Sequence, residues 1–447
     1  MNLIPPFIRR RIAHRPNLVK IVDNIGWLFF DKVLRMGVGL LVGVWVARYL
    51  GPEQFGLLSF ATAFVGLCGA IAGLGLHGIV VRDMVRDPAC KEEILGTAAV
   101  LQFVGGLLAY GLILGAIFWL RPDDTLAKLL VAILGSTTLF KASEVAVYWF
   151  ESQVQSKYIV WVQNSVFLVF AAVKVALIIS QAPLTAFAWA MMAEALAVAV
   201  MMSLMLGLRG PKLRQLRTSV VRAKTLLKDC WPLMLSGMAI MLYMKIDQIM
   251  LGQMVGDEAV GIYSAAVRIS EVWYFIPMII VASVFPAIVE AKKRSEEQYY
   301  HRLQRLYDLM VWFSVGVALP MTFLSVPVVT IIFGEDFAAS GAVLAIHIWS
   351  TLFVFLGVSS GRWLIVEGLQ LLALKRNICG AAVNVGLNLI LIPSYQIIGA
   401  AIASLIAYIL AYYLMDYFDV RTRFVFVQKT KSFFSLIYMF KRNLPRK

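Results

Sequence analysis

Apolar residues gather along this chain in runs of about twenty positions, separated by short polar or basic stretches. A helix of about 20 residues crosses the hydrocarbon core of a membrane, so each run predicts one membrane-spanning helix. Twelve spans can be marked, at residues 25–47, 55–76, 94–119, 127–149, 158–180, 184–208, 231–252, 260–289, 307–333, 341–366, 376–393 and 396–418. Polar residues interrupt the fourth span (Lys141 and Glu144) and the eleventh (Asn377, Asn384 and Asn388).

The runs are too long and continuous for the strands of a membrane barrel, which take about 9–11 residues each. A spanning backbone must also satisfy its own hydrogen bonds, as a helix does. The composition agrees, because 60% of the 447 residues are hydrophobic, 15% are charged and the mean hydropathy is +0.80. These values lie far from those of a soluble domain. The sequence therefore predicts an all-α integral membrane protein.

One short passage occurs twice. It reads ARYLGPEQFGLLSFA at residues 47–61 and QMVGDEAVGIYSAA at 253–266, with an offset of 205 positions. The matched residues are Gly51 with Gly256, Glu53 with Glu258, Gly56 with Gly261, and Ser59 with Ser264. Such a repeat indicates two copies of one structural module. Six helices per copy account for the offset, and an even number of crossings gives both copies the same orientation, as in parallel transporter repeats.

The repeat predicts two pseudo-symmetric six-helix lobes that rock about a central site. The predicted parts are a flank (1–24), an N-lobe (25–208), a basic linker (209–230), a C-lobe (231–418) and a basic tail (419–447). Two interpretations of the linker stay open. It forms either an amphipathic helix on the membrane surface or a solvated basic segment. The first places Leu213, Leu216, Val220, Val221 and Leu227 toward lipid.

The basic residues predict the orientation, because loops facing the cytoplasm carry an excess of Lys and Arg. With the N-terminus inside, 31 of the 41 Lys and Arg residues fall in inside segments, and two, Arg48 and Arg121, fall in outside loops. We therefore expect a multi-pass protein of the cytoplasmic (inner) membrane with both termini in the cytoplasm. This bias also explains most of the net charge of +15, with a further attraction to membrane lipids. We expect no nucleic-acid partner.

No catalytic motif is present. The sequence contains no P-loop, no dinucleotide fingerprint and no HExxH, and the outside loops are too short for a catalytic domain. Cys68, Cys90, Cys230 and Cys379 are scattered, so we expect neither a disulfide nor a metal. The first 24 residues contain RRR at 9–11 and no small-residue cleavage site, which favours a retained flank. We predict a protein that is not an enzyme and has no cofactor beyond a coupling H⁺ or Na⁺.

Charged residues inside the predicted spans are the informative polar feature, because charge in a membrane is costly and usually functional. The cations are Lys32, Arg35, Lys141, Lys174, Lys245, Arg268 and Arg362, and the anions are Asp31, Glu144, Glu194, Asp247 and Glu271. Helical spacing pairs Asp31 with Arg35, Lys141 with Glu144 and Arg268 with Glu271. No local partner is evident for Lys174, Lys245 or Arg362.

Two interpretations of these charges stay open. They are structural pairs between helices, or they line a water-filled cavity that binds an anionic headgroup. On the second interpretation the candidate substrate-binding residues are Lys32, Arg35, Arg48, Lys141, Lys174, Lys245, Arg268 and Arg362. The candidates for binding a coupling ion are Asp31, Glu194, Asp247 and Glu271.

The sequence resembles the polysaccharide-unit (O-antigen, Wzx) flippases of the MOP superfamily, which also holds the MATE transporters. Matching passages are NIGWL at 24–28, VARYLGPEQFG at 46–56, GLHGIVVRD at 75–83, IDQIMLGQMVGDEAVGIYSAA at 246–266 and NVGLNLILIPSYQIIGAA at 384–401. Single matches include Trp149, Phe150, Glu271, Pro277, Pro286 and Leu344, with a further passage at 324–334. The resemblance runs from about residue 22 to about residue 416.

The resemblance implies a MATE-like fold and a substrate consisting of an oligosaccharide on undecaprenyl pyrophosphate. The family moves this unit to the outer leaflet for the synthesis of O-antigen lipopolysaccharide, capsule or exopolysaccharide, so a polymerase and chain-length proteins of that pathway are implied partners. The related lipid II flippases place cations and an acid in the first helix. Asp31, Lys32 and Arg35, with Arg48 in the following turn, are their counterparts here.

Two other functions stay open. A multidrug antiporter of the same superfamily would have the same fold, but the excess of cations inside the spans argues against a site for cationic drugs. A membrane-embedded polysaccharide polymerase or ligase would need a sizeable outside loop, and the outside loops here are minimal.

Overall fold

The computed structural model describes residues 16–442, with side chains described except at 16–25, 28, 213, 286 and 436–442. The basic run at 9–11 and the last residues, 443–447, lie outside the described part. All regular elements within residues 16–442 are helical, which confirms the predicted all-α class. The chain divides into two compact units. Unit 1 holds the chain up to Leu50 together with Phe60–Met241, and unit 2 holds Gly51–Ser59 together with the chain from Leu242.

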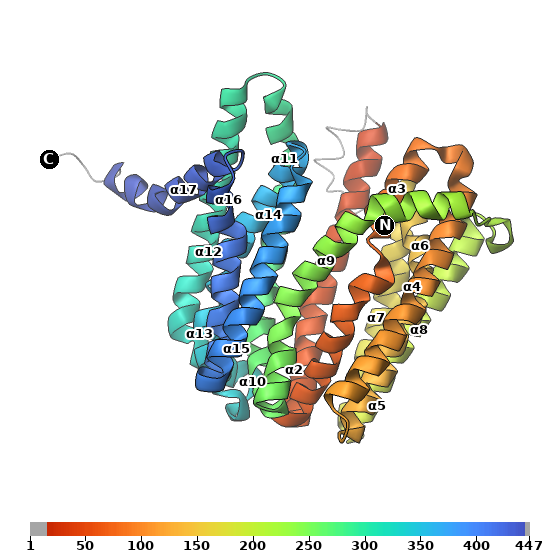
Figure 1. The fold of residues 1–447 in the computed structure, drawn as a ribbon, viewed down its shortest axis with the longest axis horizontal. Helices are drawn as coiled ribbons and strands as arrows, with labels where there is room; N and C mark the ends of the chain where they lie inside the picture. The colour runs from red at the N-terminus through yellow and green to blue at the C-terminus, as the bar shows by residue number, and fades with distance from the viewer. Residues whose placement is uncertain (1–15, 443–447) are drawn as a thin grey trace. The chain divides into compact units, whose positions relative to one another are not determined.

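Unit 1 is a bundle of long helices joined by short connections (Figure 1). Its helices are α2 (Pro16–Gly73), α3 (Leu76–Arg86), α4 (Lys91–Leu120), α5 (Thr125–Gly135), α6 (Val145–Ser152), α7 (Ser156–Ile179), α8 (Leu184–Arg209) and the first part of α9 (Val220–Met254). Short 3₁₀ segments cover Pro88–Cys90, Ser136–Glu144 and Leu213–Gln215. The core of this unit includes Leu76, Ile94, Phe150 and Leu226, all fully buried.

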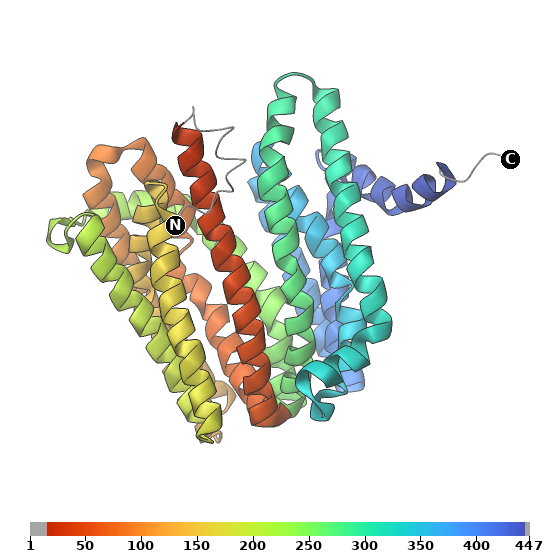
Figure 2. The same ribbon diagram turned by 180° about the vertical axis from the view of Figure 1, so that it is seen from behind.

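Unit 2 contains the second half of α9 and eight further helices. These are α10 (Asp257–Glu271), α11 (Phe275–Lys292), α12 (Glu296–Phe333), α13 (Ser340–His347), α14 (Ser350–Val366), α15 (Gln370–Ile409), α16 (Met415–Phe418) and α17 (Arg423–Arg442). 3₁₀ turns cover Val272–Tyr274 and Glu335–Phe337, and a π-helical turn covers Leu410–Leu414. Figure 2 shows α11 and α12 side by side as an antiparallel pair. Tyr299, Leu303, Tyr307 and Phe355 are fully buried in the core.

Ten segments of the described chain are long and apolar enough to cross a membrane. Eight of them each cover one predicted span, and the other two, Phe29–Arg86 and Gln370–Phe418, each cover most or all of two. Each long helix contains a backbone break. Gly51 has φ 72° within α2, and Gln396 has φ 47° within α15. The number of segments therefore agrees with about twelve crossings.

Two predicted spans are interrupted within their length. The fourth runs through α5, a 3₁₀ stretch at Ser136–Glu144 and α6, and this stretch contains the polar residues that weakened the prediction. The eighth is divided by the turn at Val272–Tyr274, after which Pro277 lies in the first turn of α11. Proline is tolerated there because the first amides of a helix have no partner within it.

The basic linker at 209–230 is not a single surface helix. A 3₁₀ turn covers Leu213–Gln215, and residues from Val220 onward already belong to α9, which continues as a predicted span. Leu216 packs against the core of unit 1 rather than facing lipid, whereas Val220, Val221 and Leu227 are exposed. Figure 1 shows that the start of α9 lies across other helices of unit 1 and that α9 then bends. Pro232 lies in the first half of α9, and proline bends a helix.

The two copies of the repeated passage contact each other within unit 2. Gly51 and Gly256 both have positive φ, 72° and 132°, so both copies turn at their first glycine. The second glycines lie at a close backbone contact: a Cβ at Gly56 would overlap the carbonyl oxygen of Asp257, and one at Gly261 would overlap that of Pro52. Each second glycine is therefore required because it is the residue without a Cβ. By contrast, a Cβ at Gly111, part of a GxxxG spacing in α4, would meet no described atom within 4 Å.

The glycine contact predicts a large difference between two glycine-to-alanine substitutions. Gly56→Ala forces the Cβ into the backbone of Asp257 and should lower the free energy of unfolding by about 1–3 kcal/mol or more. Gly66→Ala is the matched control, because its Cβ meets no described atom within 4 Å and alanine favours a helix. The measurement is the midpoint of thermal unfolding in detergent, and equal midpoints for the two variants would contradict this packing.

Candidate functional site

In unit 1 the predicted pair of Asp31 and Arg35 is present. The Arg35 Nε atom lies 2.8 Å from Asp31 Oδ1 and also donates to Asn164 Oδ1 at 3.1 Å. Asn164 belongs to α7, so this contact ties α2 to α7. The Arg35 guanidinium lies 5.5 Å from the ring centre of Phe167. Its Nη2 atom is buried and has no hydrogen-bond partner in the described part of the chain.

Two further ion pairs hold unit 1 together. Lys141 Nζ lies 2.6 Å from Glu144 Oε1, which confirms the pairing predicted from helical spacing. Lys174 of α7 lies 2.7 Å from Glu194 of α8, with side chains 19% and 21% exposed. The sequence showed no local partner for Lys174, and its partner lies 20 positions away on the neighbouring helix.

Lys32 and Arg48 of α2 are both exposed. Lys32 has no carboxylate within 4 Å among the described residues. It is therefore an uncompensated cation in a segment long and apolar enough to span the membrane. An unpaired cation in such a position favours a polar or anionic contact.

In unit 2, Glu271 pairs with a different cation from the one expected. Helical spacing predicted Arg268, but the ion pair within 4 Å joins Glu271 to Lys245 of α9 at 3.5 Å. Arg268 instead places its guanidinium 5.4 Å from the ring centre of Phe55. Arg362 of α14 is exposed and has no ion-pair partner within the described residues.

Asp247 of α9 lies in a buried polar cluster of unit 2. It is 2% exposed and accepts hydrogen bonds from Tyr263 at 2.6 Å, from the Asn388 amide at 2.6 Å and from the Ser404 hydroxyl. Asn388 also donates to Asn384 at 3.2 Å. No cationic side chain of the described chain lies within 4 Å of this carboxylate. A buried carboxylate without a cation is costly, so it favours a proton or a small cation.

The fold of α15 assembles this cluster. The chain reverses at Gln396, and a Cβ at Gly399 would overlap the backbone of Leu391. The second half of α15 therefore packs closely on the first, which brings Ser404 to Asn384 and Asn388. Sequence reasoning noted these asparagines as interruptions of a span and as part of the family resemblance, but not as partners of Asp247. Their spacing of four positions, which puts both on one helix face, was the available signal.

Sequence reasoning also missed a second buried cluster in unit 2, which consists of charged residues. Arg376 of α15 and Lys429 of α17 both pair with Asp416, at 3.4 Å and 2.6 Å. Lys429 lies in the predicted tail and Arg376 at a predicted loop boundary, so neither was counted among the charges inside the spans. His347 is also buried and lies 3.0 Å from the hydroxyl of Ser270.

The helices and ion pairs described above are those of a multi-pass integral membrane protein. Comparison with known protein families identifies the family to which the chain belongs. A profile described as polysaccharide biosynthesis protein matches residues 21–292, more than half of the chain. A profile described as MatE matches residues 232–390. The chain belongs to the polysaccharide biosynthesis protein family. This confirms the resemblance inferred from the sequence.

Individual relatives agree with this placement. The chain is 22% identical over 427 residues to the probable low-salt glycan biosynthesis flippase Agl15 of Haloferax volcanii, covering 89% of this chain and 84% of that protein. A multidrug resistance MATE transporter in an inward-facing conformation has a TM-score of 0.70 at 16% identity, covering 89% of this chain and 96% of that one. The lipid II flippase MurJ has a TM-score of 0.70 at 14% identity, covering 95% and 94%. At these identities, the structural likeness shows the fold.

The pair of Lys174 and Glu194 predicts strong coupling between two substitutions. Lys174→Met leaves the Glu194 carboxylate without its partner and should destabilise unit 1 by about 1–3 kcal/mol, less than for a fully buried pair. The double variant with Glu194→Met removes both charges and should recover most of that loss. Thermal unfolding of the two single variants and the double variant measures this coupling. Additive effects would contradict the ion pair.

Proposed function

We propose that this protein moves a lipid-linked oligosaccharide from the inner to the outer leaflet of the cytoplasmic membrane by alternating access. The membership of the polysaccharide biosynthesis protein family carries the proposal. A relative named as a probable glycan flippase and a structural neighbour that is a lipid II flippase support it. The absence of a catalytic motif from the sequence favours transport over catalysis. The proposed carrier is a polyprenyl diphosphate, and the proposed product is O-antigen, capsule or exopolysaccharide.

The cations inside the spans suit this substrate. Lys32 and the free Nη2 atom of Arg35 in unit 1, and Arg362 in unit 2, offer donors that no described acid occupies. Guanidinium and ammonium groups bind phosphate through short charge-assisted hydrogen bonds. Of the other five candidates, Lys141, Lys174 and Lys245 are already paired with acids, and the Arg268 guanidinium lies against the Phe55 ring. We therefore propose Lys32 and Arg35 in unit 1, and separately Arg362 in unit 2, as donors to phosphate groups of the substrate.

Asp247 is the proposed site of ion coupling among the four acids first considered. Asp31, Glu194 and Glu271 each have a cationic side chain within 4 Å, whereas Asp247 has hydroxyl and amide partners. A carboxylate surrounded by oxygen-bearing side chains offers ligands of the type that hard cations prefer, and it also accepts a proton. Binding of either ion would alter the hydrogen bonds between α9, α10 and α15.

The leaflet distribution of lipid-linked oligosaccharide in cells depleted of this protein tests the proposed function directly. An impermeant glycan-modifying probe applied to spheroplasts labels only units in the outer leaflet. We expect an intact unit to accumulate where the probe cannot reach it. Arrival of an unpolymerised unit in the outer leaflet would favour a polymerase or ligase, and an unchanged glycan pool would favour a drug antiporter.

The assignment of the cations predicts that Arg362→Gln and Lys32→Gln each lower the rate of glycan export about tenfold, since each removes a charge-assisted contact with phosphate. Membrane insertion should be unchanged, because no described ion pair is broken. Arg86→Gln, which removes an exposed cation from a predicted loop, is the matched control and should export normally. Export rate per amount of inserted protein is the measurement, and normal rates in both variants would refute this assignment.

The assignment of Asp247 predicts a loss of coupling rather than a loss of folding. Asp247→Asn keeps the shape and one acceptor oxygen, and its NH₂ group can donate to the hydroxyl oxygens of Tyr263 and Ser404, but it removes the charge that binds the ion. Flipping in proteoliposomes should then respond to an imposed membrane potential but no longer to a pH or sodium gradient. Asp336→Asn, an exposed acid in the same unit, is the control. An unchanged response of Asp247→Asn to both gradients would exclude this residue from coupling.

A further inference from the structure

Three charged side chains are buried together where α15, α16 and α17 of unit 2 meet. Arg376, Asp416 and Lys429 are 4%, 3% and 0% exposed. Arg376 Nη1 lies 3.4 Å from Asp416 Oδ1, and Lys429 Nζ lies 2.6 Å from Asp416 Oδ2. The transport mechanism proposed above uses none of the three. Because two cations share one carboxylate, this charged triad carries a net charge of +1 when all three groups are ionised.

Lys429 is fully satisfied by the protein. Besides Asp416, its ammonium group donates to the Tyr412 carbonyl at 2.7 Å and to Ser360 Oγ at 3.0 Å, so all three of its donors are used. Burial lowers the pKa of Lys429 to about 8, a value at which it remains largely protonated at neutral pH. The excess charge of the triad therefore rests with Arg376.

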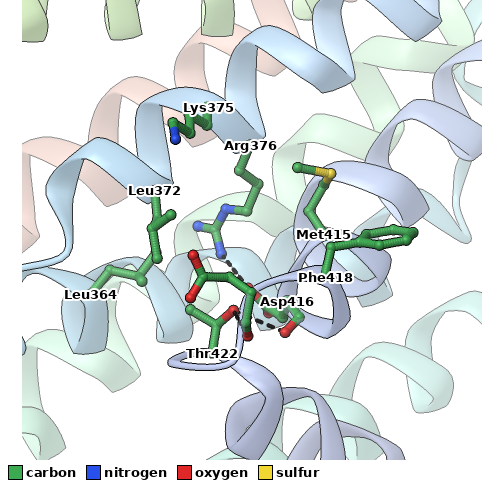
Figure 3. Close-up of a pocket in the computed structure, with 9 residues that line it drawn as sticks. Leu364, Leu372, Lys375, Arg376, Met415, Asp416, Phe418 and Thr422 are labelled. Carbon is green, nitrogen blue, oxygen red and sulfur yellow. Dashed lines mark hydrogen bonds and ion pairs between the residues drawn. The ribbon is translucent and has the colours of Figure 1, made fainter.

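Arg376 borders a cavity of about 180 Å³ (Figure 3). Its Nε atom is buried and has no hydrogen-bond partner among the described residues. Figure 3 shows its side chain reaching toward Asp416, with Leu364 and Leu372 on one side and Met415 and Phe418 on the other. A buried donor without a partner is costly, so an acceptor in this cavity would complete the site.

Other charged residues at the cavity favour an anion as its ligand. Lys375 lines it and is exposed, with no carboxylate of the described chain within 4 Å. Asp419 also lines it, but Arg421 binds this carboxylate through its side chain and its backbone N–H, which holds the pKa of Asp419 at about 2. The negative charge of Asp419 is thus directed mainly at Arg421, with a weaker electrostatic interaction with Lys375. Two cations and two acids line the cavity, and Arg421 and Lys429, which do not line it, pair with those two acids.

The surroundings of the cavity indicate a membrane surface. The predicted topology places the start of α15 and the segment after residue 418 on the cytoplasmic side, where anionic lipids are concentrated. The amphipathic helix α17 exposes Phe424, Val427 and Phe434 as well as Lys431, which is the pattern of an interfacial helix. The apolar walls formed by Leu372 and Phe418 suit the glycerol and upper acyl region of a lipid.

We propose that this cavity binds the headgroup phosphate of an anionic membrane lipid, with Lys375 and Arg376 as its donors. The phosphate would accept from the free Nε of Arg376 and from the Lys375 ammonium, and it would neutralise the excess charge of the triad. The lipid would thereby brace α17 against α15 and α16. This site is independent of the proposed glycan transport, so either proposal can fail without the other.

Lipid binding to the purified, delipidated full chain tests the proposal. Native mass spectrometry and thermal unfolding are measured with phosphatidylglycerol, with phosphatidylcholine as the zwitterionic lipid, and with inorganic phosphate alone. We expect phosphatidylglycerol to bind and to raise the midpoint of unfolding, and the other two to do so far less. An equal effect of inorganic phosphate would overturn the proposal in favour of a soluble anion, and an equal effect of phosphatidylcholine would overturn the preference for anionic lipids.

Two variants and one control locate the binding. Lys375→Gln removes one donor and should weaken binding of phosphatidylglycerol about tenfold. Leu372→Trp fills the cavity without changing any charge and should abolish binding. Lys431→Gln removes an exposed lysine of α17 that does not line the cavity and should bind as the native protein does. Native affinity in both Lys375→Gln and Leu372→Trp, or an equal loss in Lys431→Gln, would refute the site.

Discussion

The need to compensate charge inside an apolar helical bundle is the constraint on which both units depend. In unit 1 it joins α7 to α8 through Lys174 and Glu194, and in unit 2 it joins α9 to α10 through Lys245 and Glu271. Removing one partner of such a pair is more costly than removing both, because the remaining charge stays desolvated. Lys32, Arg362 and Asp247 have no partner of opposite charge within 4 Å among the described residues. We therefore infer that these three charges serve a function.

The sequence predicted the spans well because hydrocarbon thickness fixes their length, a property that each helix has by itself. It predicted less about how single helices bend. α2 and α15 continue through two crossings each with a break at Gly51 or Gln396, and the eighth span is divided before Pro277. Such breaks depend on backbone conformation and on neighbouring contacts. The repeat showed that Gly56 and Gly261 correspond, but only the three-dimensional structure shows that the two copies touch.

The same distinction holds for the charged residues. The pairs of Asp31 with Arg35 and of Lys141 with Glu144 follow from helix geometry, and both are present. Arg268 and Glu271, which the same rule pairs, attract each other electrostatically, but the direct ion pair of Glu271 within 4 Å is with Lys245 on another helix. The cluster around Asp247 joins residues up to 157 positions apart, and no local spacing predicts such contacts. Most charges inside the spans were thus identified from sequence, but only some partners close in sequence were, and no partner on another helix was.

Acids pair with some of the cations inside the spans and leave others unpaired, which suits a protein that must release the substrate it binds. A diphosphate of charge near −2 that leaves a negative-inside cell is helped outward by about 2.3 kcal/mol per charge for each 100 mV. A site with every cation uncompensated would hold the diphosphate more strongly, and release it less readily, than one in which some cations are paired with acids. Glu144, Glu194 and Glu271 each neutralise one lysine, so fewer cations remain to bind phosphate. On the proposed mechanism, the acids therefore set the strength of binding low enough for the membrane potential and a coupled ion to complete the transfer.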